Sequence, residues 1–61
     1  MFKVNVLEVN RQDEVTENVL ISYDIQANHK LKAITEAGKQ FKQNELYQVF
    51  KHNYFLKAIE V

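Results

Sequence analysis

Two strand-like segments lie at the ends of this chain, and they constrain its fold more than any other feature. Residues 2–9 and residues 54–61 are both rich in β-forming side chains, each carries two spaced charges, and neither contains Gly or Pro. These two segments flank all the others in the sequence, and we expect them to lie together in one sheet. Such a sheet has apolar side chains on both of its faces.

A further strand is predicted over Val19–Ala27, where apolar and polar side chains alternate. The polar residues 10–18 before it predict a hairpin loop that connects it to the first strand. In the first strand the alternation slips at Leu7, which indicates either a β-bulge near Leu7 or a sheet with both faces partly covered. The side chains expected to face the helices are Phe2, Val4, Val6, Val19, Ile21, Tyr23 and Ile25.

A helix is predicted after Asn28, whose side-chain oxygen is suited to an N-cap. Its apolar face is expected to contain Leu31, Ile34, Ala37, Gly38 and Phe41.

Gly38 has two interpretations, because it either lets the helix approach the sheet closely or ends the helix. The continuing periodicity through Lys42 favours the first interpretation. Asn44 predicts a second N-cap, followed by a short helix with Leu46, Val49 and Phe50 on one face. The pair His52-Asn53 interrupts this pattern before the last strand.

The order of elements predicts a single α+β domain over residues 1–61. A right-handed crossover that brings the last strand beside the first gives a three-stranded antiparallel sheet of order 2-1-3. One helix and a short second helix then pack on one face, and the other face has no cover within this chain. The phase of the last strand stays open, because its outward side chains are either Tyr54, Leu56 and Ala58 or Phe55, Ile59 and Val61.

The residue types present restrict the chemistry of so short a chain. It has no Cys, which removes disulfides and thiolate metal sites. The only imidazoles, His29 and His52, have a spacing that matches no metal-ligand pattern. The only serine, Ser22, lies inside a strand, and a single glycine, Gly38, cannot form a glycine-rich phosphate loop. We therefore expect no metal, no cofactor and no enzymatic activity, with a stability that depends on packing or association.

The first residues do not resemble a secretory signal, because polar Asn5 and Glu8 interrupt the apolar positions. The longest apolar runs are three residues long, Val19-Leu20-Ile21 and Tyr54-Phe55-Leu56, far short of a membrane span. We therefore expect a cytoplasmic protein without a membrane partner.

Charge is distributed unevenly although the net charge is zero. Residues 1–27 contain five acidic and two basic side chains, whereas residues 28–61 contain six basic and three acidic ones. The basic half favours one alternative function, nucleic-acid binding, in which lysines contact phosphates and tyrosines stack on bases. The zero net charge and the single Arg argue against it. The residues of this alternative are Lys42, Tyr47, Lys51, Tyr54 and Lys57.

The surplus of apolar positions indicates a protein-binding surface instead. Uncovered sheet faces with several large apolar groups usually mark interfaces. The acidic side chains of the predicted loop would steer the protein toward a basic surface on its target. The candidate contact residues are Leu7, Val9, Leu20 and Phe55 with the acidic Asp13, Glu14 and Glu17.

The layout consists of a hairpin from Phe2 to Ala27, a helix opening at Asn28-His29-Lys30-Leu31, and a closing strand from Tyr54 to Val61. In this layout the chain resembles small phage-encoded host-takeover and counter-defence proteins, among them inhibitors of bacterial RNA polymerase and some anti-CRISPR proteins. The resemblance implies a non-enzymatic protein that acts in the host cytoplasm by binding and inhibiting or modulating a bacterial enzyme. A homodimer through the uncovered sheet face is the other association that we expect.

Overall fold

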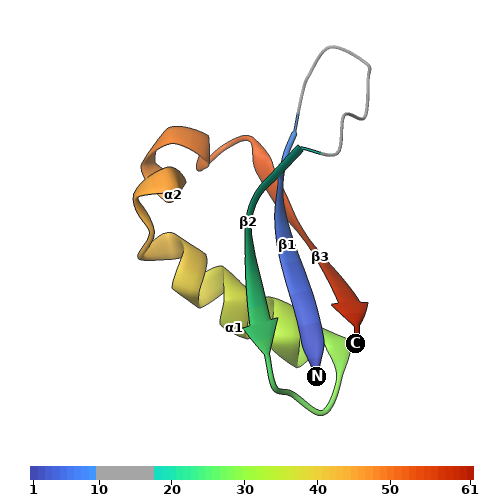
Figure 1. Ribbon diagram of the computed structural model, residues 1–61. Helices are drawn as coiled ribbons and strands as arrows, with labels where there is room; N and C mark the ends of the chain where they lie inside the picture. The colour runs from blue at the N-terminus through green and yellow to red at the C-terminus, as the bar shows by residue number, and fades with distance from the viewer. Residues whose placement is uncertain (10–17) are drawn as a thin grey trace.

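Three antiparallel strands form one sheet with the order β2-β1-β3, as the sequence predicts (Figure 1). The computed structural model describes residues 1–9 and 18–61. The two terminal segments pair with each other, and the Val61 amide donates to the Met1 carbonyl at 3.0 Å. Along the chain the elements are β1 (Phe2–Glu8), β2 (Asn18–Ile25), α1 (Lys30–Lys42), α2 (Glu45–Phe50) and β3 (Tyr54–Glu60).

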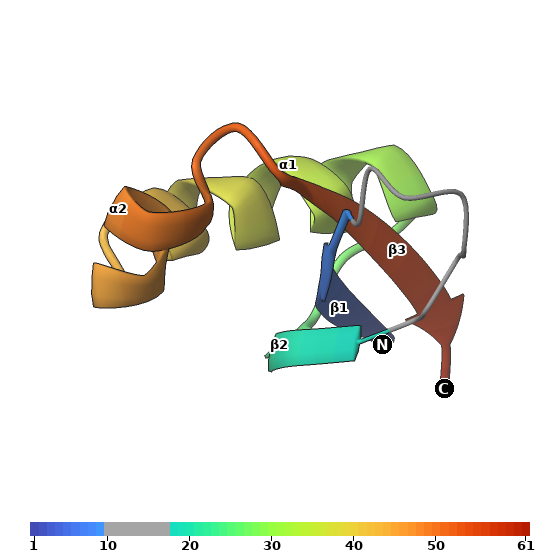
Figure 2. The same cartoon turned by 90° about the horizontal axis from the view of Figure 1, so that it is seen from above.

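Helix α1 lies across one face of the sheet and encloses the core with it (Figure 2). The central strand contributes Val4 and Val6 to this side, both fully buried, and α1 contributes Ala33 and Ala37. Gly38 lies inside α1, so the alternative interpretation, that Gly38 ends the helix, is wrong. A Cβ at this position would stand 3.4 Å from Leu56 Cδ1. This is an ordinary van der Waals distance, and the fully buried side chains of α1 that precede Gly38 in the sequence are the small Ala33 and Ala37.

The buried face of α1 differs from the predicted one at Leu31, which is 73% exposed. The buried positions are Ala33, Ala37 and Phe41, at a spacing of four residues. Leu31 lies about 120° around the helix from Ala37, because successive residues are about 100° apart. The prediction that placed Leu31 on the buried stripe is therefore wrong, since the helix is rotated to turn its small side chains toward the sheet.

One of the two predicted helix N-caps is present in the structure, and the other is not. Asn44 is the N-cap of α2, and its side chain accepts a hydrogen bond from the Leu46 amide at 2.9 Å, as predicted. The prediction of Asn28 as the first N-cap is wrong, because α1 begins at Lys30 and His29 occupies the cap position in an extended conformation. No side-chain hydrogen bond caps this end.

A β-bulge interrupts the pairing of β1 with β2 beside Leu7, and Leu7 is itself buried on the face away from α1, so both alternatives stated for Leu7 hold. The register steps from Val6 opposite Ile21 to Leu7 opposite Val19, so Leu20 is an extra residue on β2. Because paired residues share a face, Val19 lies on the same side as Leu7. The prediction that Val19 faces the helices is therefore wrong.

Helix α2 adds an aromatic cluster beyond the end of α1. The ring of Phe41 lies 5.9 Å from that of Tyr47 and 4.7 Å from that of Tyr54, and the two tyrosine rings are 6.0 Å apart. Phe41 is fully buried, whereas Val49 on α2 is exposed. The cluster joins both helices to the start of β3, and its tilted and edge-on ring pairs are favourable arrangements.

The open question of the phase of β3 is settled by its register with β1. Leu56 and Ala58 pair with Val6 and Val4 on the helix side. Phe55 pairs with Leu7 and therefore lies on the opposite side. The second of the two predicted phases is the one observed.

Candidate interaction surface

The side of the sheet away from α1, which we call the open face, is built from three cross-strand rows. Each row takes one side chain from every strand, in the order β2, β1, β3. Cross-strand neighbours in such a row are close enough for direct contact. The rows are Asp24–Lys3–Ile59, Ser22–Asn5–Lys57 and Val19–Leu7–Phe55.

The third row, Val19–Leu7–Phe55, is apolar throughout, and we call it the apolar row. Its central residue, Leu7, is only 2% exposed, whereas Val19 is 47% and Phe55 41% exposed. Val9 follows β1 at the same end of the sheet, where its amide donates to the Asn53 carbonyl at 2.8 Å, and it is also exposed. The exposed apolar surface therefore comes from Val19, Phe55 and Val9. Leu7 lies buried at the centre of the row.

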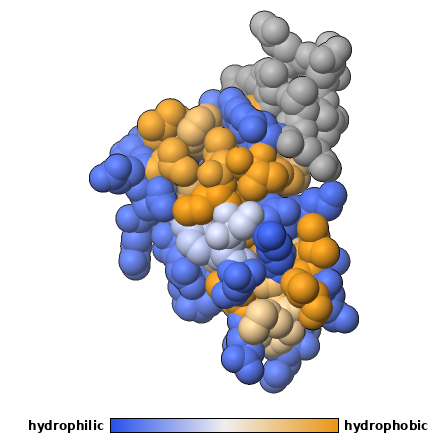
Figure 3. Space-filling view, in the orientation of Figure 1, coloured by the Kyte–Doolittle hydropathy of each residue, from blue (hydrophilic) through white to orange (hydrophobic). Residues whose placement is uncertain are grey.

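The middle row is polar and divides the open face. Ser22 Oγ donates to Asn5 Oδ1 at 2.6 Å, and Lys57 lies across from Asn5 on the other side. Figure 3 views this side of the molecule and shows a large apolar area in its upper half and smaller apolar areas below, with polar side chains between them. Ile59 is the exposed apolar residue on β3 beyond the polar row.

The predicted contact residues are only partly brought together by this geometry. Leu7, Val9 and Phe55 meet at one end of the open face, and Leu20 is half-buried at the bulge beside Val19. The acidic candidates Asp13, Glu14 and Glu17 lie outside the described residues.

Sequence reasoning missed Val19, because strict alternation assigns it to the helix side. Only the bulge on β2 transfers Val19 to the open face, and no pattern within residues 19–27 signals it.

The residues of the nucleic-acid alternative do not form one surface. Tyr47 and Tyr54 are half-buried and pack on Phe41 and on each other. Tyr54 pairs with Glu8 on the helix side of the sheet, whereas Lys57 lies on the open face. The exposed Lys42 ends α1, and the exposed Lys51 is the C-cap of α2. The two tyrosines thus stack within the fold and are separated from Lys57 by the sheet.

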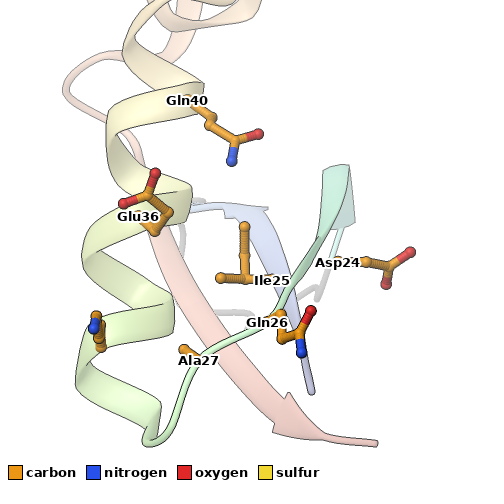
Figure 4. Close-up of a pocket in the computed structure, with 7 residues that line it drawn as sticks. Asp24, Ile25, Gln26, Ala27, Glu36 and Gln40 are labelled. Carbon is orange, nitrogen blue, oxygen red and sulfur yellow. The ribbon is translucent and has the colours of Figure 1, made fainter.

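An open groove of about 290 Å³ runs between α1 and the C-terminal half of β2 (Figure 4). Its apolar part is formed by Ile25, which points toward the helix, and by Ala27. Asp24 and Glu36 supply two carboxylates from different elements, but Asp24 points away from α1. The two carboxylates therefore do not converge on a common point in the groove.

The two histidines are exposed and lie near opposite ends of α1. His29 precedes its first residue and lines a shallow depression with Lys30 and Glu60. His52 lies in the turn after α2. Within residues 1–9 and 18–61, no three side chains of His, Cys, Asp or Glu gather in a way that could hold a metal ion. No helix in this described part of the chain has the length and apolar character needed to cross a membrane.

Comparison of the chain with protein-family models, with curated proteins and with solved structures finds no match.

Proposed function

We propose that this protein is a non-enzymatic interaction module that binds a partner protein through the apolar end of its open face. The observation that carries the proposal is the exposed apolar surface of Val19, Phe55 and Val9 around the buried Leu7. Large apolar side chains grouped at one end of a sheet face lose unfavourable contact with water when a partner covers them. The partner is expected to be a bacterial enzyme that the protein inhibits or modulates, as the sequence resemblance implies.

The rigid support of this surface favours binding without large rearrangement. Val19, Leu7 and Phe55 sit on three paired strands, so their backbone positions are held by the sheet. A preorganised surface loses less conformational entropy on association than a flexible one. The area is small, which suits a contact with a few central apolar anchors surrounded by polar side chains.

The acidic side chains between β1 and β2 in the sequence provide a way to attract a partner. In the sequence, residues 10–17 lie between β1 and β2, and they include Asp13, Glu14 and Glu17. Acidic side chains beside an apolar contact accelerate association with a basic surface and make it sensitive to salt. The preferred target surface is therefore basic, such as the nucleic-acid-binding side of an enzyme.

A capture experiment with matched variants tests the proposal. The tagged protein, Phe55→Glu and Leu31→Glu are each incubated with bacterial lysate, with and without nuclease. Leu31→Glu is the control, because Leu31 is an apolar side chain on α1 that is more exposed than Phe55 and lies away from the open face. We expect a stoichiometric protein partner that survives nuclease, is lost with Phe55→Glu and is retained with Leu31→Glu. Thermal unfolding establishes that both variants are folded.

Two results would contradict the proposal. Equal capture by the wild type and Phe55→Glu would show that the apolar row is not the contact. Recovery that collapses after nuclease treatment would assign the protein to nucleic-acid binding instead, and Lys42, Lys51 and Lys57 would then be the residues to replace.

The steering role has its own test once the partner is purified. Reversing the charges of Asp13, Glu14 and Glu17 to lysine is expected to slow association and to reduce its dependence on ionic strength. An unchanged association rate with an unchanged salt dependence would remove these carboxylates from the mechanism.

A further inference from the structure

The two edges of the sheet differ in how they are protected from pairing with another chain. Helix α1 packs mainly on β3 and β1 and less on β2. Lys57 also stands in the middle of β3, and lysine on an edge strand discourages strand addition. The regular part of β2 after the bulge, Ile21–Ile25, contains no Lys, Arg, Pro or Gly. Among the described residues, β2 pairs only with β1.

The hydrogen bonds given at the ends of the sheet show which backbone groups of β2 point outward. Val61 donates to Met1 and Val9 donates to the Asn53 carbonyl, so odd-numbered residues of β1 hydrogen-bond toward β3. Because the direction alternates along a strand, even-numbered residues of β1 bond toward β2. The backbone amides and carbonyls of their partners Ile21, Tyr23 and Ile25 therefore point toward β1.

The amides and carbonyls of Ser22 and Asp24 consequently point to the free edge of β2. An exposed row of such groups is a template for another strand.

We propose that β2 is a self-association edge, at which two copies of this chain join their sheets by antiparallel pairing of β2 with the partner's β2. The two-fold axis passes beside Tyr23, at the centre of the regular stretch Ile21–Ile25. In this register Ser22 lies opposite Asp24 of the second copy, so both outward-pointing residues of each chain form backbone hydrogen bonds. The result is a continuous six-stranded sheet that keeps α1 of both copies on the same side.

The side chains in this register are complementary to a second copy. On the helix side, Tyr23 faces its own equivalent, and Ile21 faces Ile25 of the other chain. Aromatic and β-branched cross-strand pairs are among the more stabilising ones. Ile21 and Tyr23 are only half-buried in the single chain, so they retain apolar surface for such pairs.

Space for the second strand exists beside β2. The groove between α1 and the end of β2 borders Ile25 and Ala27, so an open space adjoins this end of the strand on the helix side (Figure 4). The chain has zero net charge, so two copies do not repel each other as whole molecules. On the open face each Asp24 carboxylate meets a small Ser22, so no like charges stand directly opposite.

Two substitutions of opposite charge at Ser22 test both the edge and its register. In the proposed dimer, Ser22→Lys places two ammonium groups opposite the two Asp24 carboxylates, whereas Ser22→Asp places two carboxylates there. Both variants lose the hydrogen bond from Ser22 to Asn5, so they are matched in that respect. Cross-strand charge pairs predict that Ser22→Lys lowers and Ser22→Asp raises the dimer Kd by about 2- to 30-fold.

Sedimentation equilibrium measures these dissociation constants over a wide range of protein concentration. We expect the wild type to form a species of two 7.2 kDa chains. Ile59→Lys places a charge on the opposite edge strand and is expected to leave the dimer unchanged. The double variant Ser22→Asp/Asp24→Lys restores opposite charges across the pair, so it is expected to recover the dimer that Ser22→Asp loses.

Each other outcome overturns a defined part of the inference. A wild type that stays monomeric at millimolar concentration removes self-association. A higher dimer Kd for Ser22→Lys as well as for Ser22→Asp contradicts the register centred beside Tyr23. Loss of the dimer with Ile59→Lys alone moves the contact to β3 or to the open face. Circular dichroism of every variant excludes unfolding as the cause, and none of these results depends on the partner proposed for the apolar row.

Discussion

Replacing Gly38 with alanine is expected to stabilise this protein, although Gly38 lies where the helix approaches the sheet. A glycine in a helix interior is less favourable than alanine by about 1 kcal/mol. The added Cβ would meet Leu56 Cδ1 at 3.4 Å, an ordinary van der Waals distance to the end of a flexible side chain. The contact therefore removes little of the gain, and we expect Gly38→Ala to raise the free energy of unfolding by about 0.5–1 kcal/mol.

Urea and thermal unfolding at one fixed protein concentration measure this change, because self-association would otherwise shift the midpoint. For a domain of this size, the expected gain corresponds to a rise in Tm of about 2–8 °C. Gly38→Val is the size control and is expected to be less stable than Gly38→Ala, since its branched Cβ carries two further carbons into the crowded helix face.

A loss of stability in Gly38→Ala would refute the reasoning, because it would mean that the Leu56 side chain cannot move away from the added methyl group. The same substitution in a Leu56→Ala background separates the gain in helix propensity from the cost of the contact with Leu56. If the contact with Leu56 is strained, Gly38→Ala stabilises the Leu56→Ala protein by more than it stabilises the wild type. If the helix propensity dominates, the two gains are equal within about 0.5 kcal/mol.

Substitutions at three other positions have outcomes that urea unfolding can check. Phe41→Ala removes a fully buried ring that contacts two tyrosines and should cost about 3–5 kcal/mol, with a smaller loss for Phe41→Leu. Asn44→Ala removes the hydrogen bond to the Leu46 amide and should cost about 1 kcal/mol, whereas Asn44→Asp keeps the acceptor and should stay near the wild type. Leu31→Glu should change stability by less than about 0.5 kcal/mol because Leu31 is exposed, and a loss of several kcal/mol would mean that Leu31 belongs to the core.

Much of the fold follows from local patterns in the sequence. The alternation after Val19 and the helical spacing that ends at Phe41 identify element types, because strands and helices repeat with different periods. Asn44 caps α2 through a contact two residues away, which sequence alone specifies. The strand order also follows, since a right-handed crossover after one hairpin allows few arrangements.

The candidate surface was less accessible from the sequence, because its composition depends on the sheet register. Phe55 was one of two alternatives until its pairing with Leu7 placed it on the open face. Leu7 was expected as a contact residue, but it has almost no exposed surface. Val19 came to the same row only through the bulge at Leu20.

The sequence by itself determined which segments are strands and helices, because those preferences arise within a few residues of the chain. Tertiary structure alone decided which faces those elements present. A one-residue bulge moved Val19 across the sheet, and the rotation of α1 that brings Ala33, Ala37 and Gly38 close to the strands left Leu31 in water. Register and helix rotation depend on contacts between segments far apart in the chain, and no local periodicity encodes them.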